Sequence, residues 1–408
     1  MRIIVLGGGS DQIALIKELK NRGHLVYLVD YLDNPLAEKF ADKFFQISTL
    51  DEDSIYELAL KHGIELITTA CTDQALLTMA NVSEKLNLPC YLNAKTAKNV
   101  TDKAYMKKKM EENGIPTSKS VVLEINKYND SIRGICFPLV VKPCDCNSSK
   151  GVKCVENSLG LKQAIQKAYE LSRSKRVIIE EYKEGREISI DAWSDSQGVK
   201  ILSVTETIKM EENDNRFTIY QSKYPFSRSD ELEMKIQDTV EKICKVFKLN
   251  NCPLLVQAIV QGDNLNVIEF SARMGGGSKY KFIEYMSSIN IMKVYVNRIL
   301  GDTLQTVQPQ WSKKAMELDY VYAYKGKVHK LVGFDEMKKN GQIKELFLYK
   351  PLKCNIDKRI TSSDRVLGFL IEEDTYDDVE KTRKEIVANV DILDDEGHSM
   401  MYKKCFQL

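Results

Sequence analysis

A short run near residue 270 carries the side chains best suited to chemistry on phosphates. Glu269, Ser271 and Arg273 alternate along a predicted strand, so all three point to one face. Gln257 lies on the preceding strand, across a predicted hairpin. Oxygen ligands of these types suit magnesium, and a neighbouring arginine can stabilise the charge that develops in phosphoryl transfer. A strand with a polar solvent face and a surface Glu–Arg pair is the alternative.

A lysine and a loop of small residues form a second candidate for phosphate binding. Lys142 ends an apolar strand, where it can set a point charge on phosphates. The loop that follows is Cys146-Asn147-Ser148-Ser149-Lys150-Gly151-Val152, whose backbone N–H groups could approach phosphate oxygens. The order of residues is not that of a Walker A loop. A surface hairpin loop is the competing interpretation.

The strand that ends in Glu180-Glu181-Tyr182, with Lys183 and Glu187 after it, is the third candidate. This run suits an edge on which an adenine base lies, with backbone groups reading the purine. Glu187 would then accept hydrogen bonds from ribose hydroxyls. An ordinary strand exit with a solvent-facing glutamate is the alternative.

Four further features are candidates for substrate binding. The run Gly275-Gly276-Gly277 permits positive φ and close approach, so a substrate carboxylate could lie against its amides. Lys279 could pair with that carboxylate, although exposed lysines are usually just solvated. Arg365 could face the same site or form an ion pair with Asp364 or a neighbour. Asp73 follows a strand end, where α/β sheets bind ligands, but a helix N-cap role is favoured for it or its neighbour.

The elements that must position these residues begin with strand–glycine turn–helix–strand, which predicts a parallel sheet covered on both faces. We expect helices over 101–113, 159–172, 230–247 and 376–390, and strands over 2–6, 25–29, 66–69, 137–142, 176–182, 187–193, 254–260 and 265–270. Residues 205–225 read as polar and poor in strands. We expect three domains, at residues 1–93, 94–310 and 311–408, with a mobile lobe over about 118–185.

The overall composition excludes several classes of partner. The chain has 408 residues, and 59 Lys+Arg against 58 Asp+Glu give a net charge of +1, so no strong field favours nucleic acid or an anionic membrane. No apolar stretch approaches the length of a membrane helix. Ten scattered cysteines do not resemble a secreted disulfide framework, and a cytoplasmic location is expected.

Taken in order, these motifs resemble the ATP-grasp superfamily. The order is Lys103, Lys142, the small-residue loop, Glu180-Glu181-Tyr182, Glu187, Gln257 and Glu269-x-Ser271-x-Arg273. The layout is most similar to that of biotin carboxylase, glycinamide ribonucleotide synthetase and the large subunit of carbamoyl phosphate synthetase. The resemblance covers nearly the whole chain. It implies a Rossmann-like pre-ATP-grasp domain, a two-lobed ATP-grasp domain and a C-terminal α+β domain.

The resemblance also implies an activity and a role for each motif. The protein would be an ADP-forming ligase that activates a carboxylate as an acyl phosphate and joins it to an amine or similar nucleophile, with ATP and one or two magnesium ions. Arg273 and Lys142 would act in catalysis, and Gln257, Glu269 and Ser271 would hold the metal. The phosphates would lie against Lys103, Lys142 and the flap residues Ser148, Ser149, Lys150 and Gly151. Glu180, Glu181, Tyr182, Lys183 and Glu187 would line the nucleoside. The resembled enzymes are often dimers, so the resemblance allows a homodimer.

Two features of the sequence leave alternatives open. The family usually has Asn where Ser271 stands, and a hydroxyl reaches less far, so a catalytically weak regulatory ATP-binding protein is one alternative. A Rossmann-type oxidoreductase is the other, because Gly7-Gly8-Gly9 is followed by Asp30 at about the spacing of a ribose ligand. The full G-x-G-x-x-G is absent, since position 12 is Gln. No biotin attachment motif is present.

Overall fold

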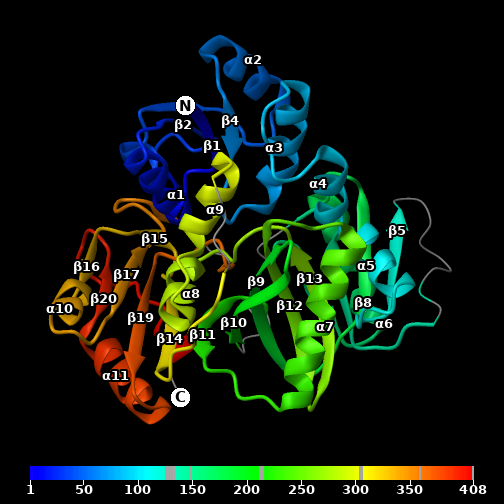
Figure 1. The fold of residues 1–408 in the computed structure, drawn as a ribbon. Coiled ribbons are helices and arrows are strands. Elements are labelled where there is room, and N and C mark those ends of the chain that lie inside the picture. Colours follow the sequence, from blue (N-terminus) through cyan, green and yellow to red (C-terminus); the bar gives the residue numbers. More distant parts are fainter. Residues whose placement is uncertain are drawn as a thin grey trace.

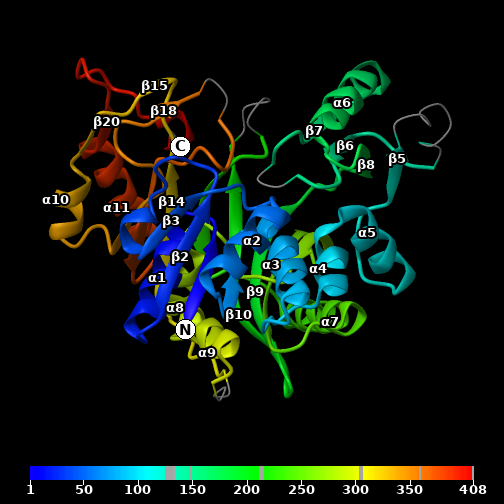
Figure 2. The ribbon, with the colours of Figure 1, turned by 90° about the horizontal axis from the view of Figure 1, so that it is seen from above.

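The computed structural model describes residues 1–124, 132, 134–146, 149–210, 216–302, 307–357 and 360–406 (Figure 1). Ser148, one of the predicted flap residues, lies outside this part of the chain. Figures 1 and 2 show an N-terminal sheet, a large central sheet that continues into the C-terminal part, and a small lobe that stands to one side.

The N-terminal part is a parallel four-stranded sheet of order β3-β2-β1-β4, which confirms the predicted parallel sheet. Its strands are β1 (Arg2–Leu6), β2 (Leu25–Asp30), β3 (Lys43–Gln46) and β4 (Leu66–Thr68), and its helices are α1 (Ser10–Asn21), α2 (Glu52–His62) and α3 (Asp73–Lys85). The strand β3 was not predicted, because it is a four-residue edge strand without a fully buried residue.

Two helices connect this sheet to the small lobe. Asp102 ends α4 (Ala94–Thr101) and caps α5 (Lys103–Glu112), because its carboxylate accepts from the amides of Ala104 and Tyr105. The lobe is an antiparallel sheet of order β5-β8-β6-β7 with one helix. Its elements are β5 (Ser120–Glu124), β6 (Leu139–Pro143), β7 (Lys153–Val155), α6 (Ser158–Leu171) and β8 (Arg176–Glu181).

The central sheet has eight strands in the order β13-β12-β9-β10-β11-β14-β19-β17. They are β9 (Arg186–Asp195), β10 (Gly198–Lys209), β11 (Ile219–Tyr224), β12 (Cys252–Gln261), β13 (Asn264–Ser271), β14 (Ala315–Val321), β17 (Glu345–Leu348) and β19 (Leu367–Glu373). The helices α7 (Asp230–Phe247), α8 (Lys279–Ser287) and α11 (Tyr376–Asn389) pack against it. The predicted helices over 230–247 and 376–390 are thus confirmed.

The prediction that residues 205–225 are poor in strands is wrong. Much of this stretch belongs to β10 and β11. Polar residues of both strands are buried: Thr205 and Ser222 are no more than 1% exposed. Because polar residues occupy buried positions here, the sequence lacks the alternation of apolar and polar residues from which a strand is predicted.

The remaining elements are a helix that packs against the N-terminal part and the short elements of the C-terminal part. Helix α9 (Ile291–Leu300) lies along α1 (Figure 1). The Tyr295 hydroxyl of α9 donates to the carbonyl of Thr69 at 2.8 Å. The C-terminal part adds β15 (Gly326–Lys327), β16 (Lys330–Val332), α10 (Phe334–Lys339), β18 (Asn355–Ile356) and β20 (Asp391–Leu393).

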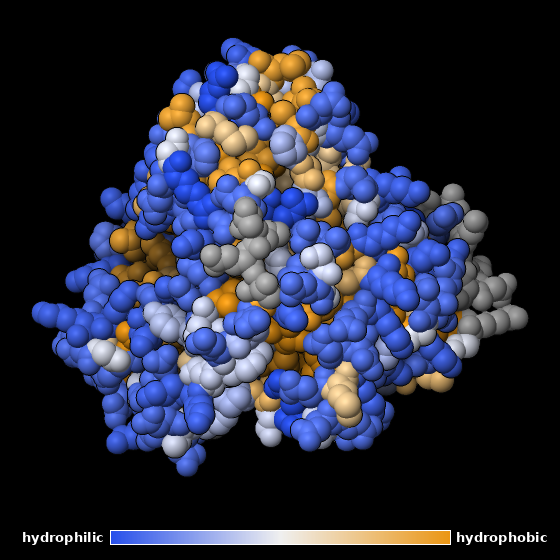
Figure 3. Space-filling view, viewed as in Figure 1, coloured by the Kyte–Doolittle hydropathy of each residue, from blue (hydrophilic) through white to orange (hydrophobic). Residues whose placement is uncertain are grey.

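The surface in the view of Figure 3 is mostly hydrophilic, with apolar residues gathered over the N-terminal part and in hollows between the parts. Among the helices of the described ranges, none combines the length and the apolar character that crossing a bilayer requires.

Candidate active site

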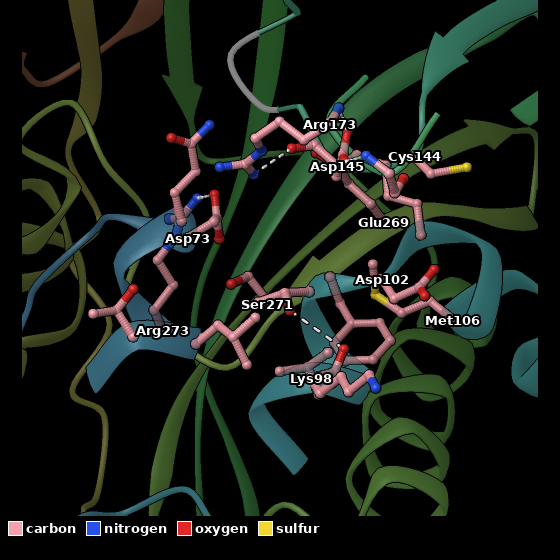
Figure 4. Close-up of a pocket in the computed structure, with 18 of the residues that line it drawn as sticks. Asp73, Lys98, Asp102, Met106, Cys144, Asp145, Arg173, Glu269, Ser271 and Arg273 are labelled. Carbon is pink, nitrogen blue, oxygen red and sulfur yellow. Dashed lines mark hydrogen bonds and ion pairs between the residues drawn. The ribbon is translucent and has the colours of Figure 1, made fainter. Parts of the chain in front are cut away.

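A cavity of about 850 Å³ opens where the N-terminal sheet, the small lobe and the central sheet meet. Its walls include the N-terminal ends of α1, α3 and α8, strands β6 and β8 of the lobe, and strands β9 to β13. A second cavity of about 480 Å³ adjoins it, and Figure 4 shows residues that line this second space. Residues that border both cavities include Asp73, Lys103, Gln257, Glu269 and Arg273.

The predicted metal ligands lie on the β12–β13 hairpin. Glu269 stands directly across from Gln257, as the hairpin predicted. Burial would raise the pKa of Glu269, but the charges of Lys103 and Lys142 outweigh it and lower the pKa to about 2. Ser271 is 6% exposed, and its Oγ has no hydrogen-bond partner among the described residues. An ionised carboxylate and a buried oxygen without a partner are donors that suit magnesium.

A metal bound here would need ligands from outside the protein. No group of three or more His, Cys, Asp or Glu side chains converges in the described part of the chain. Magnesium is commonly held by one or two carboxylates together with water and substrate phosphates. The donor set around Glu269 fits that pattern.

Arg273 reaches from the end of β13 to the N-terminal part. Its Nε donates to Asp73 Oδ1 at 2.6 Å, and a second guanidinium nitrogen donates to the other carboxylate oxygen. Figure 4 places the two residues beside the cavity. The N-cap residue of α3 is Thr72, which makes no side-chain capping bond. Thr72 thus occupies the N-cap position that was favoured for it or Asp73, whereas the Asp73 carboxylate is bound to Arg273.

The two candidate phosphate-binding lysines both line the large cavity, and they come from different elements. Lys103, at the start of α5, forms an ion pair with Glu269. Lys142, at the end of β6, forms an ion pair with Glu180 at 2.8 Å. Burial would lower the pKa of Lys103, but Glu269 reverses this and raises it. Both lysines are buried and held by carboxylates.

The predicted nucleoside edge also borders the cavity. Glu181, Tyr182 and Lys183 line it, as does Glu187 from β9. The amide of Glu181 already donates to the Lys119 carbonyl at 3.0 Å, and that of Tyr182 to the Pro138 carbonyl at 2.9 Å. These two N–H groups are therefore used within the lobe.

The carboxylate of Glu187 is held by two neighbouring strands. Its Oε2 pairs with Lys209 of β10, and its Oε1 accepts from Gln257 Nε2 at 3.4 Å. Lys209 lines the cavity but was not predicted as a site residue. The signal for it was present in the sequence, as a lysine at the end of a strand, but the strand itself was missed.

The flap residues divide between the cavity and the lobe. Ser149 and Lys150 line the cavity, and Ser149 Oγ donates to the carbonyl of Phe217 at 3.0 Å. Gly151 is not among the cavity-lining residues. It has φ +75°, and an added Cβ would lie 2.9 Å from Pro143. A glycine is therefore required there by packing within the lobe.

The predicted substrate residues gather at the far end of the cavity, near α8. Gly276, Lys279 and Arg365 all line it. Lys279 is only 5% exposed and donates to the Thr205 hydroxyl, which overturns the expectation of a solvated lysine. Burial lowers the pKa of Lys279 to about 8.

Arg365 makes no ion pair with Asp364. Its guanidinium lies 3.6 Å from the centre of the Tyr320 ring, and its Nε donates to the Tyr322 hydroxyl at 3.3 Å. Asp364 instead accepts hydrogen bonds from Thr361. The guanidinium is thus directed to the cavity, without a carboxylate partner among the described residues.

Two carboxylates near this end were not predicted. Asp11, at the start of α1, accepts from the amides of Gly277 and Ser278 at 3.0 and 2.8 Å. Asp191 of β9 accepts from the Gly275 amide at 2.9 Å and from the Ser203 hydroxyl at 3.0 Å. The Asp11 bonds fix the glycine run against the N-terminal part, and the Asp191 bond fixes it against the central sheet. No local sequence signal predicts these bonds to the glycine run, because the carboxylate and the amide that it binds are more than 80 positions apart in the chain.

Comparisons with known proteins agree with this geometry. Residues 135–281 match the ATP-grasp domain family. This segment of the chain therefore resembles an ATP-grasp domain. A phosphoribosylamine–glycine ligase from Thermococcus gammatolerans is 24% identical to it over 96% of this chain and 92% of that relative.

Solved structures give the same fold over almost the full length. A phosphoribosylglycinamide synthetase from Anaerococcus prevotii superposes with a TM-score of 0.75 at 19% identity, covering 97% of this chain and 99% of the other chain. An L-amino acid ligase from Bacillus licheniformis superposes with a TM-score of 0.80 at 18% identity, covering 97% and 98%. The predicted family and fold class are confirmed, and the relatives are ligases.

The oxidoreductase alternative has no support. Asp30 does not offer its carboxylate to a ribose, because Oδ2 accepts from the Gly8 amide at 2.6 Å and Oδ1 from the Leu32 amide at 2.9 Å. The carboxylate closes the glycine turn itself. None of the relatives described above is an oxidoreductase.

Proposed function

We propose that this protein is an ATP-grasp enzyme, an ADP-forming ligase that activates a carboxylate with ATP and joins it to an amine or a similar nucleophile. The observation that carries the proposal is the junction of the two cavities. There, the ionised Glu269, the unpartnered Ser271 hydroxyl and the Arg273 guanidinium meet Lys103 from the opposite wall. Such a junction suits the transfer of a phosphoryl group from ATP to a carboxylate.

ATP would lie along the lobe side of the large cavity. Adenine would sit beside Glu181, Tyr182 and Lys183, ribose near Glu187, and the phosphates between Lys103 and Lys142. Gln257, Glu269 and Ser271 would hold one or two magnesium ions, which when bound supply charge neutralisation at the phosphates. Residues 118–185 would form the lid, with Ser149 and Lys150 over the phosphates.

The reaction would proceed in two steps. An oxygen of the substrate carboxylate attacks the γ-phosphorus, the bond to the β-γ bridging oxygen breaks, and ADP leaves. The neutral amine then attacks the acyl phosphate carbon, the C–O bond to phosphate breaks, and the proton lost by the amine leaves with the phosphate as the amide forms. Arg273, oriented by Asp73, would contact the transferred group. Positioning and exclusion of water would supply most of the acceleration.

Electrostatics at the far end favour an acid with an anionic group near Arg365 and Lys279. Both cations are without a carboxylate partner among the described residues, whereas Asp11 and Asp191 already accept from backbone amides. A small, polar, negatively charged acid would therefore complete this end of the cavity. The structure describes all ten cysteines and none forms a disulfide, which supports our proposal of a cytoplasmic enzyme. A homodimer is part of the same proposal, by analogy with the resembled enzymes.

Magnesium-dependent ADP release from the full chain tests this function. The wild type would be assayed with a panel of carboxylates and amines, alongside Glu269→Ala. We expect release that needs one acid together with one amine and falls at least a hundredfold in Glu269→Ala.

Glu231→Ala is the matched control, because Glu231 is an exposed glutamate on α7. It should leave ADP release unchanged. Tight binding of ATP without turnover on any pair would favour the regulatory alternative. Full turnover in Glu269→Ala would rule out the proposed role of the carboxylate.

A further inference from the structure

Behind the phosphate-binding lysine Lys142 lies a second buried lysine that does not reach the cavity. Lys107, on α5, has a side chain that is 4% exposed, and its Nζ lies 3.3 Å from Glu180 Oε2. The other carboxylate oxygen of Glu180 lies 2.8 Å from Lys142 Nζ. Glu180 thus bridges two lysines, and only Lys142 of the two lines the cavity.

Lys107 is held firmly in this place. Its Nζ donates to Thr117 Oγ1 at 2.6 Å and to the carbonyl of Val267 at 3.3 Å. All three ammonium protons therefore have an acceptor, because Glu180 is the third. The side chain joins α5, the segment before β5, β8 and β13 in one buried contact.

The charges of Lys107, Glu180 and Lys142 together determine how much positive charge Lys142 presents to a nucleotide. Without Lys107, the carboxylate of Glu180 would cancel the charge of Lys142. If Lys142 then bound the phosphates, Glu180 would be left as an unpaired negative charge close to them. With Lys107 present, the three residues carry a net charge of +1 in a site shielded from water, where each charge acts strongly. Glu180 can then orient Lys142 without neutralising it.

We propose that Lys107 is a positioning residue for nucleotide binding: it compensates Glu180 and so leaves Lys142 with an available positive charge toward the phosphates. The inference rests on the assignment of Lys142 to the phosphates in the proposed function. It extends that function to a residue that touches neither substrate.

Nucleotide affinity tests the proposal without knowledge of the acid or the amine. The dissociation constant for MgATP would be measured by calorimetry on the full chain, at neutral pH, for the wild type, Lys107→Met and Lys108→Met. We expect Lys107→Met to weaken binding about tenfold or more, because one nearby charge is lost. Lys108→Met is the matched control, since Lys108 is the next residue on the same helix and is 73% exposed, and its affinity should not change.

A double variant separates this role from simple packing. If Lys107 acts by compensating Glu180, then Lys107→Met combined with Glu180→Gln should bind MgATP within about threefold of Glu180→Gln alone, because no carboxylate is left to compensate. A structural role would instead add a further loss. Equal affinity of folded Lys107→Met and wild type, or an additive double variant, overturns the proposal.

The pH dependence of affinity keeps the test decisive even where Lys107→Met fails to fold. The pKa of Lys107 is lowered to about 8, chiefly by burial and further by the charge of Lys142. The charges of Glu180 and Glu269 act in the opposite direction and raise it. Lys103 lies one turn earlier on the same helix. Wild-type affinity should therefore fall as pH rises through about 8, and Lys107→Arg should remove this fall, because arginine stays charged.

The two proposals fail in different ways. A pH profile that is the same in wild type and Lys107→Arg contradicts the role of Lys107. A wild type that does not bind MgATP at all contradicts the proposed function itself and with it the assignment of Lys142.

Discussion

At the scale of single residues, the cations that face the expected phosphates are already paired. Lys103 is bound to Glu269, Lys142 to Glu180 and Arg273 to Asp73. A nucleotide must therefore replace or share these carboxylates rather than meet free charges. The pairs also hold long side chains in place, so less conformational entropy is lost when the ligand binds.

The Arg273–Asp73 pair gives a prediction about the chemical step. Asp73→Asn keeps the shape but removes the charge that orients the guanidinium, so we expect kcat for ADP release to fall about tenfold. The dissociation constant for MgATP should stay within about twofold, because Lys103 and Lys142, the lysines proposed to bind the phosphates, are unchanged. Asp53→Asn, at an exposed position on α2, is the control. Unchanged kcat in Asp73→Asn would show that this carboxylate does not position Arg273.

Most of the site residues predicted from residue types and order line the large cavity. Glu269, Arg273 and Lys142 were predicted from their place at the ends of strands, and all line the large cavity. Asp11 and Asp191 were not, because a carboxylate bound to distant backbone amides leaves no local pattern. Lys279 was expected in solvent, and only the packing of α8 against β10 explains its burial.

At the scale of elements, periodic sequences were predicted well and polar strands were not. Helix α7 follows the expected range because apolar residues recur on one face, at Leu232, Ile236, Val240, Ile243 and Phe247. Strands β10 and β11 escaped prediction because they bury polar residues beside the cavity. The exceptions to simple patterning thus fall at the candidate site, where polar side chains are needed.

The turn between β8 and β9 gives a prediction about stability. Gly185 has φ +138°, and an added Cβ would lie 2.8 Å from Ile259 and still closer to the Val260 carbonyl oxygen. Gly198, the first residue of β10, has φ +115°, but an added Cβ there would have nothing within 4 Å. Gly185→Ala should lower the free energy of unfolding by about 2–3 kcal/mol, against about 1 kcal/mol for Gly198→Ala.

Urea denaturation of the two alanine variants measures this difference. Both substitutions strain the backbone, so any excess in Gly185→Ala reports the collision with β12. Equal losses would mean that the turn moves away at little cost. The lobe is joined to the central sheet through this turn, so a shift there would also alter the edge expected to hold adenine.

At the scale of the whole molecule, three expected domains are joined by non-local contacts. Strand β11 pairs with β14, so the central sheet continues into the C-terminal part without a break. Tyr295 and the Asp11 carboxylate tie the N-terminal part to α9 and to the glycine run. Composition and periodicity cannot predict such pairings, because each joins segments far apart in the chain.

A buried charge cluster lies where β11, β14 and α11 meet. Glu317 and Asp319 are both fully buried, and Gln221 donates to each of them, at 2.6 and 3.0 Å. Lys223 lies 3.2 Å and Arg383 3.6 Å from Glu317. Asp319 Oδ2 has no hydrogen-bond partner among the described residues. Burial, with the charge of Glu317, raises the pKa of Asp319 well above its usual value of 3.8.

This cluster predicts that a neutral residue at position 319 stabilises the protein. In the unfolded chain Asp319 ionises near its usual pKa, whereas in the folded chain it retains its proton to higher pH. The free energy of unfolding should therefore decrease as pH rises from about 4 toward the folded pKa, and the loss should be complete above it. Asp319→Asn cannot ionise, so at neutral pH it should exceed the wild type by about 1 kcal/mol or more, and the gain should vanish near pH 4. Urea denaturation from pH 4 to 9 measures both curves, with Asp374→Asn, 80% exposed, as the control. A variant that is less stable than the wild type at neutral pH would instead mean that the ionised Asp319, paired across the cluster with Lys223 and Arg383, holds the central sheet to α11.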